Sequence, residues 1–234
     1  MSAGNTEDTT PAPLIDWQQL TIAYGDTTVL HDVNFQWQHG QRIALLGKSG
    51  AGKSSLLKKI YTDLAKNTTA QAIGWVPQQL GLVDQLSSFH NVYMGQLDQH
   101  SAFYNLLNLI WPQRTHKTAI ADLLQQLAIE QTLFSRVAQL SGGQQQRIAI
   151  ARALYSKADI ILADEPVSNL DTPMANTVIN LLIQQSQSSV VALHNIELAL
   201  AFATRIIGIK AGRIVIDLPS DQVSTEQLDQ LYAN

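Results

Sequence analysis

The chain has 234 residues, of which 45% are hydrophobic and 15% are charged, and its formal net charge is −4. This length is enough for one large domain with a buried core, and the balance of charges lacks the basic surplus that nucleic-acid-binding surfaces carry, so we expect no nucleic-acid partner. The absence of cysteine excludes a disulfide framework and thiol chemistry.

Residues 1–13 carry two acidic side chains, no basic ones and two prolines, so they lack the basic and apolar regions of a signal peptide. We predict a disordered leader there and one folded domain over residues 14–234. The densest apolar region, 148–163, is interrupted by three charged residues, and no stretch approaches the roughly 18 uncharged residues that span a bilayer. We therefore expect the chain to work at a membrane only through a partner.

The first folded segments, 14–23 and 29–37, predict two β-strands joined by a turn at Tyr24, Gly25 and Asp26. They would form an antiparallel flap. A β-branched and apolar run at 42–46 predicts the next strand, residues 55–60 have helical spacing, and 73–76 predict a short strand that Pro77 ends.

Residues from about 79 to 155 predict a helical insertion, because leucine, glutamine and alanine dominate and apolar residues recur at helical spacing. Five apolar residues in it share one predicted helical face: Phe103, Leu106, Leu107, Ile110 and Trp111. We interpret this face as core of the insertion, with a docking groove for a partner protein as the alternative. Residues 82–89 are the better docking candidate.

The last third alternates strands and helices. Residues 160–163 form a continuous apolar run, typical of a central parallel strand covered on both faces, and we expect this strand beside the strand at 42–46. The remaining predictions are a helix at 173–186 capped by Asp171 or Thr172, a strand at 190–193 and a helix at 196–203. They are followed by a hairpin of strands at 205–210 and 213–217, turned by Ala211 and Gly212, and by a final helix whose capping box starts at Ser224.

The loop between residues 42–46 and 55–60 has the spacing G-x-x-x-x-G-K-S. Glycines let successive N–H groups turn inward, and the following helix adds its positive pole, so the loop predicts a phosphate cradle at the end of a strand. Lys53 would contact the outer phosphates, and Ser54 would offer its hydroxyl to Mg²⁺. The other predicted ATP contacts of the loop are Gly47, Lys48, Ser49, Gly50, Ala51, Gly52 and Ser55.

Two adjacent carboxylates, Asp164 and Glu165, end the strand at 160–163. Ligands of open α/β sheets gather at the carboxyl ends of strands, so we expect Asp164 to hold Mg²⁺ and Glu165 to orient the water that attacks the γ-phosphate. His194 ends the strand at 190–193 and should face the same edge as Glu165.

A second helix start, at Leu140-Ser141-Gly142-Gly143-Gln144, precedes an apolar-periodic helix. Such a start is either a second anion site or a simple cap, and the residues alone leave both open.

Taken together, these motifs resemble the nucleotide-binding subunit of an ATP-binding cassette transporter, and the resemblance runs from residue 14 to the C-terminus. It implies a P-loop NTPase core of the α/β class with a mostly parallel central sheet, an antiparallel β flap and an inserted α-helical subdomain. Tyr24 matches the aromatic that stacks on adenine, and Gln78 matches the residue that reaches Mg²⁺ and senses the permease. The other matches are the signature motif at 140–144, the catalytic glutamate Glu165, the segment Ser168 to Asp171 and the switch histidine His194.

The resemblance also implies a homodimer in which each subunit completes the other's site. Ser141, Gly142, Gly143, Gln144 and Asp171 would contact ATP in trans. Lys48, Ser55, Asn169 and Asn195 depart from the usual residues, and none of them removes a group that the chemistry needs. We therefore expect an active ATPase, with Lys53, Glu165 and His194 as its catalytic residues and Ser54, Gln78 and Asp164 at the metal.

Segments 78–87, 91–97 and 227–232 are most similar to the phosphonate-importer branch of the family. This branch implies transmembrane permease subunits, a periplasmic solute-binding protein and a peripheral location on the cytoplasmic face of the inner membrane. The alternatives are an exporter ATPase, since direction is set by the membrane subunits, and a soluble cassette ATPase without a transport role.

Overall fold

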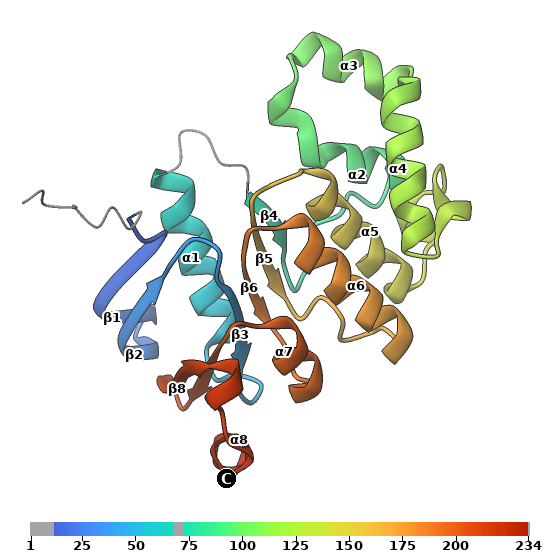
Figure 1. The fold of residues 1–234 in the computed structure, drawn as a ribbon. Coiled ribbons are helices and arrows are strands. Elements are labelled where there is room, and N and C mark those ends of the chain that lie inside the picture. The colour runs from blue at the N-terminus through green and yellow to red at the C-terminus, as the bar shows by residue number, and fades with distance from the viewer. Residues whose placement is uncertain (1–11, 68–72, 234) are drawn as a thin grey trace, which may run out of the picture.

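In the computed structural model, which describes residues 12–67 and 73–233, a twisted six-stranded sheet runs through the centre of the molecule (Figure 1). Its strand order is β4-β5-β6-β3-β7-β8, and every neighbouring pair is parallel except β7 with β8. The strands are β3 (Arg42–Leu46), β4 (Ile73–Val76), β5 (Ile160–Asp164), β6 (Ser188–Ala192), β7 (Arg205–Lys210) and β8 (Arg213–Pro219).

The inner strands β3, β5, β6 and β7 are buried at nearly every position because both faces of the sheet are covered. Along β3, Ile43 and Leu45 pack into one hydrophobic cluster with α1 (Lys53–Asn67) and the N-terminal hairpin, whereas Ala44 and Leu46 pack into a second cluster with the helices of the other face. Strands β5 and β6 divide their residues between the two clusters in the same way. This confirms the mostly parallel α/β fold that the resemblance implied, and the central strand covered on both faces that the apolar run at 160–163 predicted.

The predicted neighbour of the phosphate strand was wrong. We expected β5 beside β3, but β6 lies between them and pairs in parallel with both. The carboxyl ends of all three strands still meet at one edge of the sheet. The separation arises because α6 (Thr172–Gln185) carries the chain from β5 back to the amino end of β6, next to β5.

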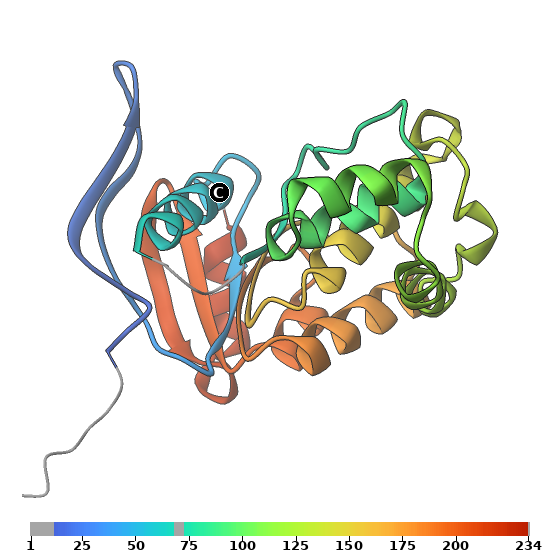
Figure 2. The ribbon, with the colours of Figure 1, turned by 90° about the horizontal axis from the view of Figure 1, so that it is seen from above.

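The N-terminal flap is a separate two-stranded antiparallel sheet, made of β1 (Ile15–Tyr24) and β2 (Thr27–Trp37), and it stands apart at one side of the molecule (Figure 2). Tyr24 is the last residue of β1 and pairs with Thr27, so the turn consists of Gly25 and Asp26 alone and the prediction of a three-residue turn was wrong. The described part of the leader, Ala12 and Pro13, belongs to neither a helix nor a strand, and the rest of the predicted leader lies outside the described residues.

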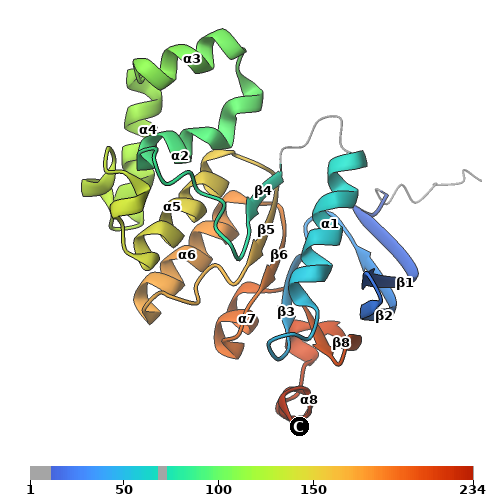
Figure 3. The ribbon, with the colours of Figure 1, turned by 180° about the vertical axis from the view of Figure 1, so that it is seen from behind.

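Between β4 and β5 the chain builds a helical layer against the face of the sheet opposite α1 (Figure 3). Its elements are α2 (Ser88–Tyr93), η1 (Met94–Gln99), α3 (Ala102–Ile110), α4 (Arg114–Gln126), η2 (Glu130–Thr132), η3 (Val137–Gln139) and α5 (Gly142–Tyr155). Helix α5 joins this layer to the sheet, since Ile148 and Ala151 are fully buried in the same cluster as β5.

Helix α3 corrects one interpretation. The apolar residues that we assigned to the core of the insertion are among the most exposed in the protein: Phe103 72%, Leu106 56%, Leu107 42%, Ile110 74% and Trp111 78%. The buried side of this helix is polar instead, since it carries the fully buried Asn108. The side-chain carbonyl of Asn108 accepts a hydrogen bond from the Gln113 N–H just beyond the end of the helix.

A cluster of hydrogen-bonded aromatic side chains fastens α3 to the rest of the insertion. The His116 ring is bonded to the Tyr104 hydroxyl through Nε2, at 3.0 Å, and to the Tyr155 hydroxyl through Nδ1, at 2.6 Å. The rings of Tyr93 and His100 face His116 from the remaining sides. Burial lowers the pKa of His116, and the nearby His100 acts in the same direction.

The chain ends with α7 (Ile196–Phe202), the β7–β8 hairpin turned by Ala211 and Gly212, η4 (Ser220–Gln222) and α8 (Thr225–Tyr232). The predicted capping box is present, with Ser224 and Gln227 each bonded to the other's backbone. Among the helices that the structure describes, none is long and apolar enough to cross a bilayer.

We predict that His116 makes the protein less stable in acid. A histidine whose pKa falls on folding stabilises the folded state above its usual value near 6.5 and loses that contribution as the pH drops below it. Between pH 7.5 and pH 5.5 the melting temperature of His116→Gln should therefore fall less than that of the wild type. The difference between the two falls should be roughly 2–4 °C, the effect of about 1 kcal/mol in a domain of this size. Circular dichroism melts would measure it, with the exposed His39→Gln as control, and equal losses in all three proteins would contradict the prediction.

Candidate active site

The loop that joins β3 to α1 turns around three glycines. Gly47, Gly50 and Gly52 have φ angles of +146°, +78° and +110°, a region that residues with side chains rarely adopt. A β-carbon on Gly52 would lie 2.6 Å from Leu30 Cδ2, so β2 closes the loop on one side. Because the loop leads directly into the N-terminus of α1, it has the geometry of an anion cradle.

Lys53 is the first residue of α1 and is only 4% exposed. Its Nζ donates to the carbonyl oxygens of Gly47, at 2.8 Å, and Lys48, at 3.2 Å. Burial lowers the pKa of Lys53, and the carboxylates of Glu165 and Asp164 oppose this shift. The ammonium group is thus held inside the loop by backbone carbonyls, where an incoming phosphate can replace them.

Asp164 ends β5 with a buried carboxylate whose Oδ1 has no hydrogen-bond partner among the described residues. Burial raises the pKa of Asp164, while a hydrogen bond from Ser54 and the charge of Lys53 lower it. An unpartnered carboxylate oxygen beside a hydroxyl suits Mg²⁺, which prefers oxygen ligands and takes few of them from protein. No group of three metal-binding His, Asp or Glu side chains occurs in the described parts of the chain, so phosphate and water oxygens would have to complete the shell.

Glu165 follows β5 in a left-handed conformation, with a φ of +54°, which is unusual for a residue with a side chain and is found at functional sites. Its N–H donates to the Ala192 carbonyl at 3.1 Å. His194 Nε2 lies 2.5 Å from Glu165 Oε1. The two side chains meet because β5 and β6 are parallel neighbours that end at the same edge.

A cavity of about 260 Å³ brings eight of the predicted site residues together. Its lining comes from β2, the phosphate loop, the start of α1, the loop after β4 and the end of β5: Val29, Ser49, Gly50, Gly52, Lys53, Ser54, Ser55, Gln78 and Glu165. The predicted Gln78, and not its neighbour Gln79, lines the cavity. Four segments far apart in the sequence, around residues 29, 49–55, 78 and 165, thus meet at this cavity.

Two predicted parts of the site lie elsewhere. Tyr24 is 54% exposed at the tip of the flap, and Val29 is the flap residue that lines the cavity. Residues 141–144 begin α5, whose apolar face packs on the side of the sheet opposite α1. A single subunit therefore separates the phosphate loop from its own signature motif.

The signature motif is a well-formed helix cap. Ser141 Oγ accepts from the Gln144 N–H at 3.3 Å, and Gln144 Oε1 accepts from the Ser141 N–H at 2.9 Å. A β-carbon on Gly142 would meet open space, whereas one on Gly143 would lie 3.3 Å from the Asn169 carbonyl oxygen. Asp171 likewise caps α6 by accepting from the Met174 N–H. The cap is thus present, and the anion-binding role of this helix start stays a prediction.

The sequence analysis missed Gln146. This side chain is 3% exposed, and its amide donates to the Glu165 carbonyl at 2.9 Å and to Ser168 Oγ at 3.4 Å. It therefore ties α5 to the turn that carries Glu165. The available signal was its position four residues before Ile150, which places a polar side chain on the apolar face of the helix.

Arg152 was also missed. Its guanidinium donates to the carbonyl oxygens of Gly81 and Leu80, each at 2.6 Å, and burial lowers its pKa from the ordinary arginine value. These carbonyls belong to the loop that begins at Gln78. The far end of α5 therefore holds the loop that enters the active site, and only the charge inside an apolar helix hinted at it.

Comparison with known proteins agrees with this architecture. The ABC transporter family matches residues 30–168. The phosphonates import ATP-binding protein PhnC of Pseudomonas entomophila is 37% identical over 241 residues, which cover 93% of this chain and 90% of that protein. The protein of the same name from Pseudomonas fluorescens is 38% identical and covers 88% and 86%.

Solved structures of similar fold include dimeric cassettes. The dimeric structure of a bacterial ABC transporter cassette superposes with a TM-score of 0.74 and 27% identity, covering 87% of this chain and 97% of that one. A dimeric post-hydrolysis cassette bound to ADP and Pi gives a TM-score of 0.69 at 28% identity, with the same coverage. The chain therefore belongs to the ABC transporter family, as an ATP-binding subunit that hydrolyses ATP.

Proposed function

We propose that this ATPase powers the uptake of a phosphonate or a related oxyanion through permease subunits, working at the cytoplasmic face of the inner membrane. The observation that supports this most is the similarity to phosphonate import proteins over nearly the whole of both chains. The active-site roles below rest on the geometry of the cavity over the phosphate loop.

When ATP enters the loop, Lys53 exchanges the Gly47 carbonyl for the outer phosphates. Ser54, Asp164 and Gln78 would hold Mg²⁺, which would offset negative charge on the phosphate oxygens. Glu165 orients the attacking water and accepts its proton, and His194, now bonded to Glu165, contacts the γ-phosphate. Tyr24 stacks on the adenine once the flap tip and the nucleotide are in contact.

In a single subunit the signature motif lies away from the phosphate loop. Dimerisation would bring the signature motif of one subunit to the ATP held by the other. In a head-to-tail pair, Ser141, Gly142, Gly143, Gln144 and Asp171 of one subunit cover the ATP held by the loop of the other. The N-terminus of α5 would then direct its free N–H groups and its positive pole at the γ-phosphate. The pair closes when both nucleotides are present and opens after hydrolysis.

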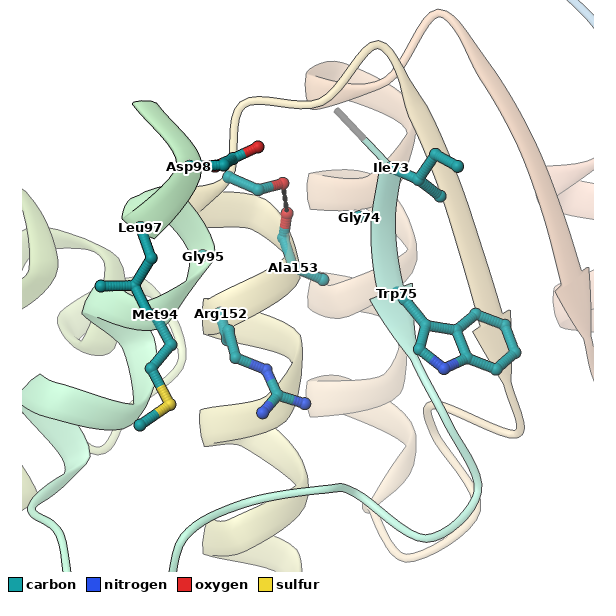
Figure 4. Close-up of a pocket in the computed structure, with 10 residues that line it drawn as sticks. Ile73, Gly74, Trp75, Met94, Gly95, Leu97, Asp98, Arg152 and Ala153 are labelled. Atoms are coloured by element: carbon teal, nitrogen blue, oxygen red, sulfur yellow. Dashed lines mark hydrogen bonds between the residues drawn. The ribbon is translucent and has the colours of Figure 1, made fainter. Parts of the chain in front are cut away.

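A second cavity, of about 330 Å³, is a docking site for the permease in this proposal (Figure 4). It lies between β4, η1 and the end of α5, and its lining includes Trp75, Met94, Leu97 and Arg152. Arg152 also holds the carbonyls of Leu80 and Gly81, so a permease segment seated here would press on the loop that carries Gln78. The predicted docking segment, 82–89, continues from that loop.

The exposed face of α3 extends this docking surface. Leu97 lines the cavity and is itself 40% exposed, and α3 begins five residues later. A continuous run of large apolar side chains at this exposure is typical of an interaction site rather than of free surface. A periplasmic solute-binding protein would complete the transporter on the other side of the membrane.

Ile110→Asp tests the α3 surface. A charge at this 74% exposed position should greatly reduce co-purification with co-expressed permease subunits, because a carboxylate buried in an apolar interface has no partner. The ATPase rate of the isolated protein should not change. Val215→Asp, at a 54% exposed apolar position on β8, is the control. Full retention of the permease by Ile110→Asp would remove α3 from the interface.

Glu165→Gln tests the hydrolytic site. Loss of a general base should lower phosphate release by about 10²- to 10⁴-fold while ATP still binds. Because the γ-phosphate then persists, the variant should form an ATP-dependent dimer in light scattering. Adding Ser141→Arg should abolish that dimer without affecting the monomer's fold. Wild-type turnover in Glu165→Gln would take Glu165 out of the mechanism, and a persistent dimer in the double variant would refute the arrangement in trans.

The substrate class is tested on the partner that selects it. The solute-binding protein encoded beside this gene should release heat on titration with alkylphosphonate, phosphite or phosphate in a calorimeter. Tight binding of an unrelated solute, with no heat from these oxyanions, would refute the substrate and leave the ATPase intact. If the neighbouring genes encode a permease but no binding protein, the exporter alternative is favoured.

A further inference from the structure

The C-terminal helix lies directly beside the phosphate loop. In Figures 1 and 3, α8 is at the end of the molecule where β3 gives way to α1. Leu231 of α8 lines a cavity of about 190 Å³ together with Lys48 and Ser49 of the loop. One residue further on, the hydroxyl of Tyr232 accepts a hydrogen bond from the Gly47 N–H at 3.3 Å.

Helix α8 is firmly attached where it makes this contact. Its N-terminus carries the capping box of Ser224 and Gln227. Leu228 and Leu231 are 5% and 2% exposed and belong to the main hydrophobic cluster. Near its C-terminus, Lys210 Nζ donates to the Gln230 carbonyl at 2.7 Å, and a cation at this end also suits the helix dipole.

Gly47 is held on three sides. Its carbonyl accepts from Lys53, its N–H donates to Tyr232, and a β-carbon on it would lie 2.3 Å from the Ile209 carbonyl oxygen. Of these contacts, the bond to Lys53 is the one that ATP must break, because Lys53 is the group that moves to the phosphates. The Tyr232 hydroxyl then remains as the polar partner of the Gly47 backbone.

We propose that Tyr232 is a positioning residue for ATP binding, which fixes the first glycine of the phosphate loop through its hydroxyl. A phosphate cradle binds well only when its N–H groups are already aimed at the ligand, so a loop that must be ordered on binding gives a weaker complex. Tyr232 does not touch the reacting atoms. Its removal therefore affects nucleotide affinity and not the rate of the chemical step.

The Tyr232 hydroxyl is suited to this task. Burial raises the pKa of Tyr232 above the ordinary tyrosine value, and the Gly47 N–H only partly opposes that shift, so the group stays neutral near pH 7. The ring itself packs against the hydrophobic cluster. Phenylalanine can keep that packing, which separates the hydrogen bond from the contribution of the ring.

The test is Tyr232→Phe in the full chain. We expect the dissociation constant of Mg-ADP in calorimetry, and the KM for ATP, to rise by about 2- to 12-fold, the range that one neutral hydrogen bond supplies. The kcat should stay at the wild-type value, and the melting temperature should fall by at most roughly 6 °C, because one neutral hydrogen bond is lost from the folded state. Hydrogen exchange of the peptide that contains Gly47, measured by mass spectrometry, should become faster in the absence of nucleotide.

Tyr61→Phe is the matched control, because Tyr61 lies two helical turns beyond Lys53, where its ring stacks on Trp75. It should leave both nucleotide affinity and exchange at residue 47 unchanged. Unchanged affinity and exchange in Tyr232→Phe would show that Tyr232 only packs and would overturn the proposal. A fall in kcat at constant KM would also overturn it. Because ADP affinity and exchange need no hydrolysis, these results are independent of the mechanism assigned to Glu165.

Discussion

A buried ammonium group is the constraint on which the active site depends. Lys53 is 4% exposed, and taking a charge this far out of water is unfavourable unless polar partners surround it. Two loop carbonyls and the nearby carboxylates of Asp164 and Glu165 provide those partners. The central sheet brings these groups together, because β3, β5 and β6 are parallel and their carboxyl ends lie at the same edge. An arriving phosphate therefore replaces partners that are already in place.

Local features of the sequence predicted much of this arrangement. The bounds of β3, β4 and β7 were correct because each is a short apolar run limited by glycine, proline or charged residues. The predicted neighbour of β3 was wrong, since β5 and β6 are both buried along their whole length and nothing in either sequence says which one touches β3. The prediction that the apolar face of α3 is core of the insertion was wrong for a related reason. Helical spacing identifies an apolar face, but whether another element covers it depends on the rest of the fold.

The site residues that the sequence did not predict act through contacts between distant segments. Gln146 reaches Glu165 across 19 residues, Arg152 reaches Leu80 across 72, and Tyr232 reaches Gly47 across 185. Each is a single polar side chain to which no motif assigned a role. The motif residues, by contrast, were visible because backbone turns and phosphate chemistry restrict several neighbouring positions at once. Tyr24 is an exception among the motif residues, because in the single subunit it lies at the exposed tip of the flap and does not line the cavity over the phosphate loop.

Helix α5 connects two surfaces that we assign to different partners. Its first turn carries the signature motif, and its last turn, with Arg152, Ala153 and Ser156, forms one wall of the proposed docking cavity. Fourteen residues at 1.5 Å each give a length of about 21 Å. A helix packed this tightly against a sheet does not compress, so it behaves as a strut. In the proposed transporter, a permease segment that tilted one end of α5 would therefore displace the other end, and closure of the proposed nucleotide-bound dimer would be transmitted to the permease along the same helix.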